Sequence, residues 1–271
     1  MLSLLLIGGG NMGGAIVRGA VAQRVFSPGE IGVVEIDAAR RESLHAETGC
    51  RTLASAGEAL DELNKKGQII LAVKPQIFAD VAQDLTPVTG PRVVISIMAG
   101  IDSGRIHHAL GPQARIVRCM PNTPCQIGKG MTAIALGMGA REGDERLARS
   151  LFDALGKTVM LDESLLDAVT AVSSSGAAYI FLMAEAMQAA AEAVDLPRDD
   201  ARLLVKQMIV GAAAMLDQKG ADAAALRRAV TSPHGTTEAA LRVFERADFE
   251  RIVREAVIAA RDRGRDLGRG A

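Results

Sequence analysis

The chain opens with a short apolar run that passes directly into glycines and then into a helical pattern. The run Leu4–Ile7 is typical of a buried strand, and Gly8, Gly10 and Gly13 have the spacing G-x-G-x-x-G. In a dinucleotide site the first glycine allows a tight turn, the second lets the backbone approach a pyrophosphate, and the third lets the helix pack closely on the strand. The expected helix N-terminus at Asn11 adds N–H groups that favour phosphate. A glycine-rich turn that binds nothing is the alternative, but this position between strand and helix favours a nucleotide site.

Composition narrows the remaining classes of protein. The 271 residues suffice for one large domain or two smaller ones, and a net charge of -1 without a basic patch argues against a nucleic-acid partner. The cysteines Cys50, Cys119 and Cys125 are odd in number and widely spaced, which indicates reduced, buried thiols in a cytoplasmic protein. We expect no signal peptide and no membrane contact, because no stretch reaches the roughly 18 uninterrupted apolar residues of a membrane span.

Short apolar runs alternate with helical patterns up to about residue 162. A helix is expected over 11–22, another should open with a capping box at Ser55–Glu58, and a third lies near 144–155. The expected strands after the first are residues 31–36, 68–73, 93–100 (ending in small residues), 116–120, 131–136 and 158–161. This alternation predicts the α/β class, with a mostly parallel, doubly wound, Rossmann-like domain over residues 1–162.

The end of the second expected strand carries both acidic and basic residues. A carboxylate about 20 residues past the glycines commonly binds the adenosine ribose hydroxyls. The strand ends near Glu35 and Asp37, and we assign Asp37 to the cofactor. Arg40 and Arg41 follow at once and would suit a 2′-phosphate, although either could equally solvate the next helix. Both NADH and NADPH therefore stay open as the cofactor.

The ends of the later strands supply further candidate residues. Pro75 cannot continue a ladder, so Lys74 sits at the carboxyl edge of the sheet, where open α/β sheets bind ligands. Lys74 could contact the cofactor or the substrate, or it could be a solvated lysine at a strand end. Ala99 and Gly100 permit close approach, and Asn122, in a loop made rigid by two prolines, is expected to support the cleft through its amide.

The second half of the chain is expected to be helical, with no strand after Ser164. The segment Gly176–Val194 is apolar on most faces, so it is either the centre of a helical domain or a surface that packs against a second copy of the chain. Further helices are expected after Pro197 and around Phe249–Ala260. We therefore expect a second, all-helical domain over residues 163–271.

Four motifs together resemble the pyrroline-5-carboxylate reductase family nearly from end to end. They are Ile7–Met12, Ala72–Gln76, Met120–Pro124, and Thr231–Pro233 with Gly235–Thr237. The resemblance implies a Rossmann-like domain followed by a helical domain that dimerises by intertwining, with dimers often assembled into decamers. The chain departs from the family's pattern at Ala177, where the family has proline, and at His234, where the family has glycine.

The resemblance implies hydride transfer from NADPH or NADH to the cyclic imine pyrroline-5-carboxylate, giving L-proline, the last step of proline biosynthesis. No metal is expected, because a protonated imine is already a good electrophile. The implied cofactor-binding residues are Gly8, Gly10, Asn11, Met12, Gly13, Asp37, Ala72, Val73, Lys74, Pro75, Ala99, Gly100 and Asn122. The implied substrate-binding residues are Val230, Thr231, Ser232, Gly235, Thr236 and Thr237.

The loop before Thr237 is suited to a carboxylate, because it opens a helix whose backbone N–H groups can bind an anion. The resemblance places Thr237 beside the substrate nitrogen, as the catalytic hydrogen-bond partner or proton relay. The structural alternative for Thr237 is a helix N-cap. His234 is a rival acid, since its pKa falls near neutral, but an exposed loop histidine is the preferred interpretation.

Two other classes of function stay open. One is a different enzyme on the same two-domain plan, either another imine reductase or a hydroxyacid dehydrogenase. Hydroxyacid enzymes of that plan use a lysine on the long helix, and Gly176–Val194 contains none. The other is a non-catalytic nucleotide-sensing protein, which an eroded substrate loop would favour, whereas Ser232–Thr237 is intact.

Overall fold

The computed structural model describes residues 1–86, 88 and 90–270. Over these residues the strands are β1 (Leu2–Ile7), β2 (Ile31–Val34), β3 (Arg51–Leu53), β4 (Leu63–Leu71), β5 (Arg92–Ser96), β6 (Ala114–Met120), β7 (Gly130–Leu136) and β8 (Gly156–Met160). The helices that accompany the strands are α1 (Asn11–Ala22), α2 (Ala38–Thr48), α3 (Ala56–Leu60), α4 (Phe78–Leu85), α5 (Ser103–Leu110), α6 (Arg146–Asp153) and α7 (Leu166–Val169). The helices that follow are α8 (Gly176–Ala193), α9 (Arg198–Leu216), α10 (Ala223–Ala229), α11 (Thr236–Arg246) and α12 (Phe249–Gly270).

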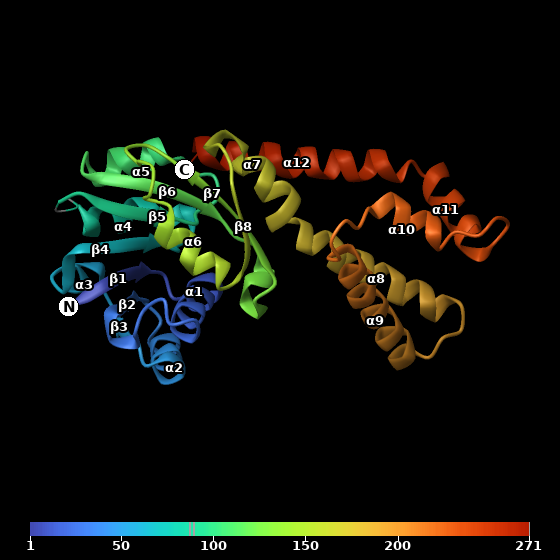
Figure 1. The fold of residues 1–271 in the computed structure, drawn as a ribbon, viewed down its shortest axis with the longest axis horizontal. Helices are drawn as coiled ribbons and strands as arrows, with labels where there is room; N and C mark the ends of the chain where they lie inside the picture. The colour runs from blue at the N-terminus through green and yellow to red at the C-terminus, as the bar shows by residue number, and fades with distance from the viewer. Residues whose placement is uncertain (87, 89, 271) are drawn as a thin grey trace. The chain divides into compact units, whose positions relative to one another are not determined.

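The strands form one sheet with the order β3-β2-β1-β4-β5-β6-β7-β8 (Figure 1). Neighbouring strands from β3 to β6 pair in parallel, β7 runs antiparallel to β6, and β8 pairs in parallel with β7. The strand order reverses between β1 and β4, which makes this the crevice where doubly wound sheets bind nucleotides. The α/β, doubly wound expectation is therefore confirmed.

The central strands are apolar on both faces because helices cover both. Along β1, Leu5 and Ile7 pack toward α3, α4 and α5, whereas Leu4 and Leu6 pack toward α1, α2 and α6. This alternation follows the period of two of a strand. Each fully buried leucine contributes about 1.5–3 kcal/mol relative to an exposed one, so the two faces hold the sheet and the loops at its edge in place.

Three local expectations need correction. β3 was not expected, because three residues with an exposed Arg51 are too short to show alternation, and the strand exists only through pairing with β2. β4 begins at Leu63 rather than at residue 68, since its first half carries Lys65 and Lys66 and lacks an apolar run. Ser55 does precede α3, but its side chain makes no capping hydrogen bond, and the helix is only 5 residues long.

The described chain divides into two compact units. One comprises Met1–Ser175 together with the segment from Ala259 onward, and the other comprises Gly176–Ile258. The second unit contains helices and no strand among its described residues, as expected. The division expected between residues 162 and 163 stays a prediction.

The C-terminal segment of α12 belongs to the unit with the sheet. Gly264 and Gly268 of α12 lie against Gly100, and a Cβ on Gly100 would be 3.1 Å from the Gly268 nitrogen. The Arg105 side chain on α5 donates to the Gly268 carbonyl at 2.7 Å. The part of α12 around Gly264 and Gly268 is thus packed on the loop that follows β5.

Candidate active site

The loops that follow the parallel strands gather at one edge of the sheet. The Gly8 amide donates to the Val34 carbonyl at 2.8 Å, and the Ala72 amide donates to the Ile7 carbonyl at 2.8 Å. The Ile97 amide continues the series to the Leu71 carbonyl at 3.1 Å. The predicted cofactor residues after β1, β4 and β5 are therefore neighbours at the crevice where the strand order reverses.

The three glycines of the motif have the geometry that a pyrophosphate site needs. Gly8 has φ +105°, and a Cβ there would be 2.6 Å from the Ala72 carbonyl oxygen. A Cβ on Gly13 would collide with the Gly8 carbonyl oxygen, so only glycine lets α1 lie this close to β1. A Cβ on Gly10 would meet nothing within 4 Å. The open space at Gly10, beside the N–H groups at the start of α1, fits the phosphates of a dinucleotide.

The acidic residues after β2 have different surroundings. The Asp37 side chain caps α2 by accepting from the Arg40 amide at 2.9 Å. Glu35 is buried, with 7% of its surface exposed, and its carboxylate lies beside Gly9 under the glycine loop. Glu35 was not among the assigned residues, although its place directly after the strand was a signal that could have selected it. The structure does not test whether Asp37 contacts the cofactor.

The loop after β4 is exposed at Lys74 and turns sharply at Pro75. Lys74 precedes the 3-10 turn Pro75–Ile77, and its side chain has no hydrogen bond or ion pair within the part of the chain that the structure describes. Ala99 and Gly100 follow β5, where Gly100 has φ +76°. These residues line the same edge of the sheet as Gly8.

Asn122 ties the end of β6 to the helical segment that leads out of the sheet. Its Oδ1 accepts from the Met131 amide at 2.9 Å, and its Nδ2 donates to the Ser173 hydroxyl at 3.2 Å. The Ser174 hydroxyl donates to the Pro121 carbonyl at 2.9 Å. Both serines lie in a π-helical turn, Thr170–Ser174, a feature frequent at functional sites. The Asn122 amide thus forms side-chain hydrogen bonds, and its support of the cofactor cleft stays a prediction.

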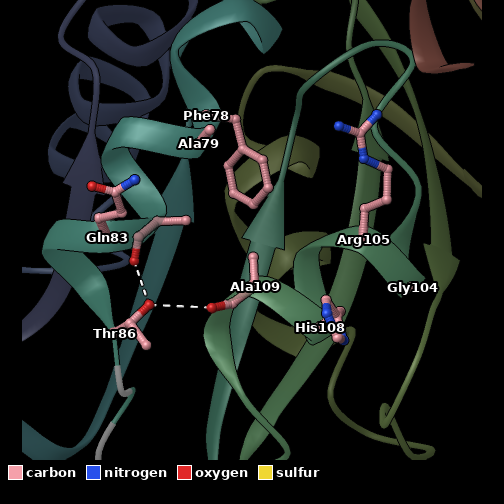
Figure 2. Close-up of a pocket in the computed structure, with 9 residues that line it drawn as sticks. Phe78, Ala79, Gln83, Thr86, Gly104, Arg105, His108 and Ala109 are labelled. Atoms are coloured by element: carbon pink, nitrogen blue, oxygen red, sulfur yellow. Dashed lines mark hydrogen bonds between the residues drawn. The ribbon is translucent and has the colours of Figure 1, made fainter. Parts of the chain in front are cut away.

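A large cavity lies away from the glycine loop. It measures about 850 Å³ and opens between α4 and α5, where Figure 2 shows Phe78, Arg105 and His108 around it. The Thr86 hydroxyl closes one side by contacting the Ala82 carbonyl and donating to the Ala109 carbonyl at 3.1 Å. None of the residues predicted to bind cofactor or substrate lines this cavity. Gly10 and Asn11 line a smaller cavity of about 110 Å³ between α1 and α2.

The predicted substrate loop connects α10 to α11 in the other compact unit. The Gly235 amide donates to the Ser232 carbonyl at 3.0 Å, and the Thr231 hydroxyl donates to the Arg227 carbonyl at 2.7 Å. A Cβ on Gly235 would collide with the Ser232 side chain, so this position requires glycine. Val230 is 61% exposed at the start of the loop. The loop is a tight turn that ends at a helix N-terminus.

Thr237 does not cap α11. The N-cap is Gly235, which places Thr236 first and Thr237 second in the helix. The alternative role of Thr237 as an N-cap is therefore wrong. Its side chain is half-buried, whereas that of Thr236 is exposed. Glu238 reaches back to accept from the His234 amide at 2.6 Å and also pairs with Arg242.

Both halves of the chain match known protein families. Residues 163–267 match the family described as pyrroline-5-carboxylate reductase dimerisation, and residues 3–100 match the family described as NADP oxidoreductase, coenzyme F420-dependent. A pyrroline-5-carboxylate reductase of Synechocystis is 38% identical over 268 residues, which is 99% of each chain.

The chain belongs to the pyrroline-5-carboxylate reductase family.

Solved structures of the pyrroline-5-carboxylate reductase family share its fold along the whole length. The Coxiella burnetii enzyme has a TM-score of 0.86 and 32% identity, with 98% of each chain covered. The Plasmodium falciparum enzyme, solved with NADP bound, has a TM-score of 0.86 and 26% identity, again over 98% of each chain. As a member of this family the chain is an oxidoreductase that uses NAD(P)H.

The departure from the family at His234 has a backbone consequence. His234 has φ +61°, in the left-handed region that glycine adopts without strain. The family's glycine at this position therefore fits the turn, and histidine occupies it at a cost. His234 is exposed, as expected for a loop residue.

The helix α8 lies in the segment that matches the reductase dimerisation family. The structure describes every residue of α8, and none is buried within the single chain. Its exposed side chains include Ile180 (53%), Phe181 (62%) and Leu182 (66%). The single chain therefore does not bury α8 at the centre of its own domain, which leaves the expected alternative that this surface packs against a second copy of the chain.

The same segment passes a simple test for membrane spans. The helical stretch Glu163–Ala193 has 31 residues and a mean hydropathy of 1.4, which is long and apolar enough by length and composition alone. One such helix is weak evidence for a membrane span, and the match to the dimerisation family covers the whole stretch.

Proposed function

We propose that this chain reduces pyrroline-5-carboxylate to L-proline with a reduced nicotinamide cofactor, the last step of proline biosynthesis. The observation that carries the proposal is membership of the pyrroline-5-carboxylate reductase family over 99% of the chain. The glycine loop after β1 and the turn before α11 are the two sites that this reaction needs.

The first site holds the cofactor. When bound, the reduced nicotinamide supplies the hydride. The N–H groups at the start of α1 and the open space at Gly10 suit the pyrophosphate, and the loops ending at Pro75 and Gly100 suit the rest of the cofactor along the sheet edge. In this proposal the chain binds either NADPH or NADH.

The second site holds the substrate carboxylate and orients the ring. In a tight turn at a helix N-terminus, the first N–H groups have no partner within the helix and can bind a carboxylate. We propose that residues 230–232 and 235–237 form this site. The Thr237 hydroxyl then acts as hydrogen-bond partner of the ring nitrogen, which holds the imine ready for hydride addition.

We further propose that residues 1–162 act as the cofactor domain and residues 163–271 as the dimerisation and substrate domain. The basic assembly in this proposal is a homodimer, and dimers assemble further into a decamer. The cytoplasm is the proposed location, supported by the unpaired cysteines Cys50, Cys119 and Cys125, which suit a reducing compartment. Neither nucleic acid nor membrane is a proposed partner.

The test is an assay on the purified, folded chain. The absorbance of NADH or NADPH is followed with and without pyrroline-5-carboxylate, and proline formation is measured in the same samples. We expect oxidation that depends on the substrate and one proline per cofactor oxidised. No substrate-dependent oxidation with either cofactor would refute the proposal, and faster turnover of a 2-oxo acid or another cyclic imine would favour a different reductase or dehydrogenase.

A further inference from the structure

The carboxylate of Glu35 lies directly beneath the glycine loop of the cofactor site. Glu35 follows β2, the strand that pairs with β1, and its backbone amide donates to the Leu53 carbonyl at 3.0 Å. A Cβ on Gly9 would be 3.1 Å from the Glu35 Cβ and 3.4 Å from its Oε2. The carboxylate therefore borders the loop at the position where a doubly wound fold receives the adenosine ribose.

Hydrogen bonds hold the Glu35 side chain in this place. Its Oε1 accepts from the Asp37 amide at 3.0 Å, and its Oε2 accepts from the Arg40 side chain at 3.3 Å. The Arg41 guanidinium donates to the carbonyls of Glu35 and Ile36 at 2.7 and 2.9 Å, which fixes the turn itself. The Asp37 carboxylate has a different role, because it caps α2.

Two of the three arginines near this position are paired with carboxylates, and the third, Arg41, donates to backbone carbonyls. The cavity between α1 and α2 is lined by Arg18 and Arg40. Arg18 pairs with Glu47 at 2.9 Å, and Arg40 pairs with Glu35 at 3.3 Å. A 2′-phosphate would add a strongly negative group beside the Glu35 carboxylate, where the three arginines are already matched in number by the carboxylates of Glu35, Asp37 and Glu47.

We propose that Glu35 sets the cofactor specificity of this chain and that it favours NADH over NADPH. The carboxylate accepts hydrogen bonds from the ribose hydroxyls of NADH and repels the 2′-phosphate of NADPH. This inference rests on the proposed function only in the identity of the cofactor, since it concerns binding and not the reduction of the imine.

The experiment measures the dissociation constants of NADH and NADPH for the full-length protein by calorimetric titration, without substrate. We expect wild-type protein to bind NADH about tenfold or more tightly than NADPH. Glu35→Gln removes the charge and keeps the shape, and we expect it to lower that ratio about tenfold or more, mainly through tighter NADPH binding. Adding Arg40→Ala to Glu35→Gln should remove the gain in NADPH affinity. Without the Glu35 carboxylate, the Arg40 guanidinium is the group that binds the 2′-phosphate.

Two further variants separate Glu35 from other carboxylates. Glu42→Gln removes an exposed charge from α2 and should change the ratio less than about threefold. Asp37→Asn tests the rival carboxylate and should also leave the ratio within about threefold. Should Glu35→Gln fail to fold, Glu35→Ser provides a second neutral side chain, and the wild-type ratio decides by itself whether the preference exists.

Tighter binding of NADPH by wild-type protein would overturn the inference. So would an unchanged ratio in folded Glu35→Gln, or a tenfold shift in Asp37→Asn. Failure of the proposed function looks different: the protein would bind NADH selectively and yet show no oxidation that depends on pyrroline-5-carboxylate.

Discussion

Gly13 lies so close to the carbonyl oxygen of Gly8 that a Cβ on Gly13 would fall far inside contact distance of that oxygen. The start of α1 is therefore packed on the end of β1 through backbone atoms. Gly10, between them, borders open space instead. One motif thus contains a glycine required by packing and a glycine that leaves room for a ligand.

This contrast predicts opposite effects for two similar substitutions. Gly10→Val should fold, because nothing lies within 4 Å of the new Cβ, but its branched side chain would occupy the space for the pyrophosphate and abolish cofactor binding. Gly13→Val should instead reduce the yield of folded protein. Circular dichroism and cofactor titration measure the two effects, and unchanged affinity in Gly10→Val would show that the motif is only a turn.

The second prediction concerns the hydroxyl of Thr237. We expect Thr237→Ala to lower turnover about 10- to 1,000-fold, the range for loss of a positioned donor. Because Gly235 caps α11, the melting temperature should change little. Thr236→Ala, on the adjacent exposed residue, is the matched control and should keep most of its activity. Equal losses in the two variants, in proportion to lost folded protein, would make Thr237 a structural residue.

The third prediction separates loop shape from acid chemistry at His234. Glycine adopts the φ of +61° without strain, so His234→Gly should keep turnover and raise the free energy of unfolding by up to about 1 kcal/mol. His234→Ala removes the imidazole but keeps the strain, and it should also keep turnover. A large loss of turnover in both variants, with both folded, would identify the imidazole as the acid.

The fourth prediction concerns the thiols. Burial raises the pKa of Cys119 and of Cys50, so less of the reactive thiolate exists at any given pH. Cys125 is buried as well. In a native sample we expect none of the 3 cysteines to react with a thiol reagent within minutes, and all 3 to react in denaturant. Rapid labelling of native protein would indicate that the surrounding structure opens readily.

Much of the fold was predictable because its signals are local. The period of two in β1, the glycine spacing that follows it and the apolar length of α8 each depend on residues close together in the chain. The same applies to the turn before α11, where Pro233 restricts the backbone and Gly235 permits the close approach of Ser232. These patterns were sufficient to predict the α/β class and the helical second half, whereas the binding and catalytic residues stay predictions.

Other features depended on contacts between distant segments. The strand β3 forms only by pairing with β2, and the end of α12 packs on Gly100 more than 150 positions earlier, as the Arg105–Gly268 hydrogen bond with a separation of 163 also shows. The sequence alone placed Glu35 and Asp37 at the end of one strand and favoured Asp37 for the cofactor. Only the tertiary structure decided their surroundings, because the Asp37 carboxylate accepts from an N–H group at the start of α2 while the packing of β2 beside the glycine loop buries Glu35 under Gly9.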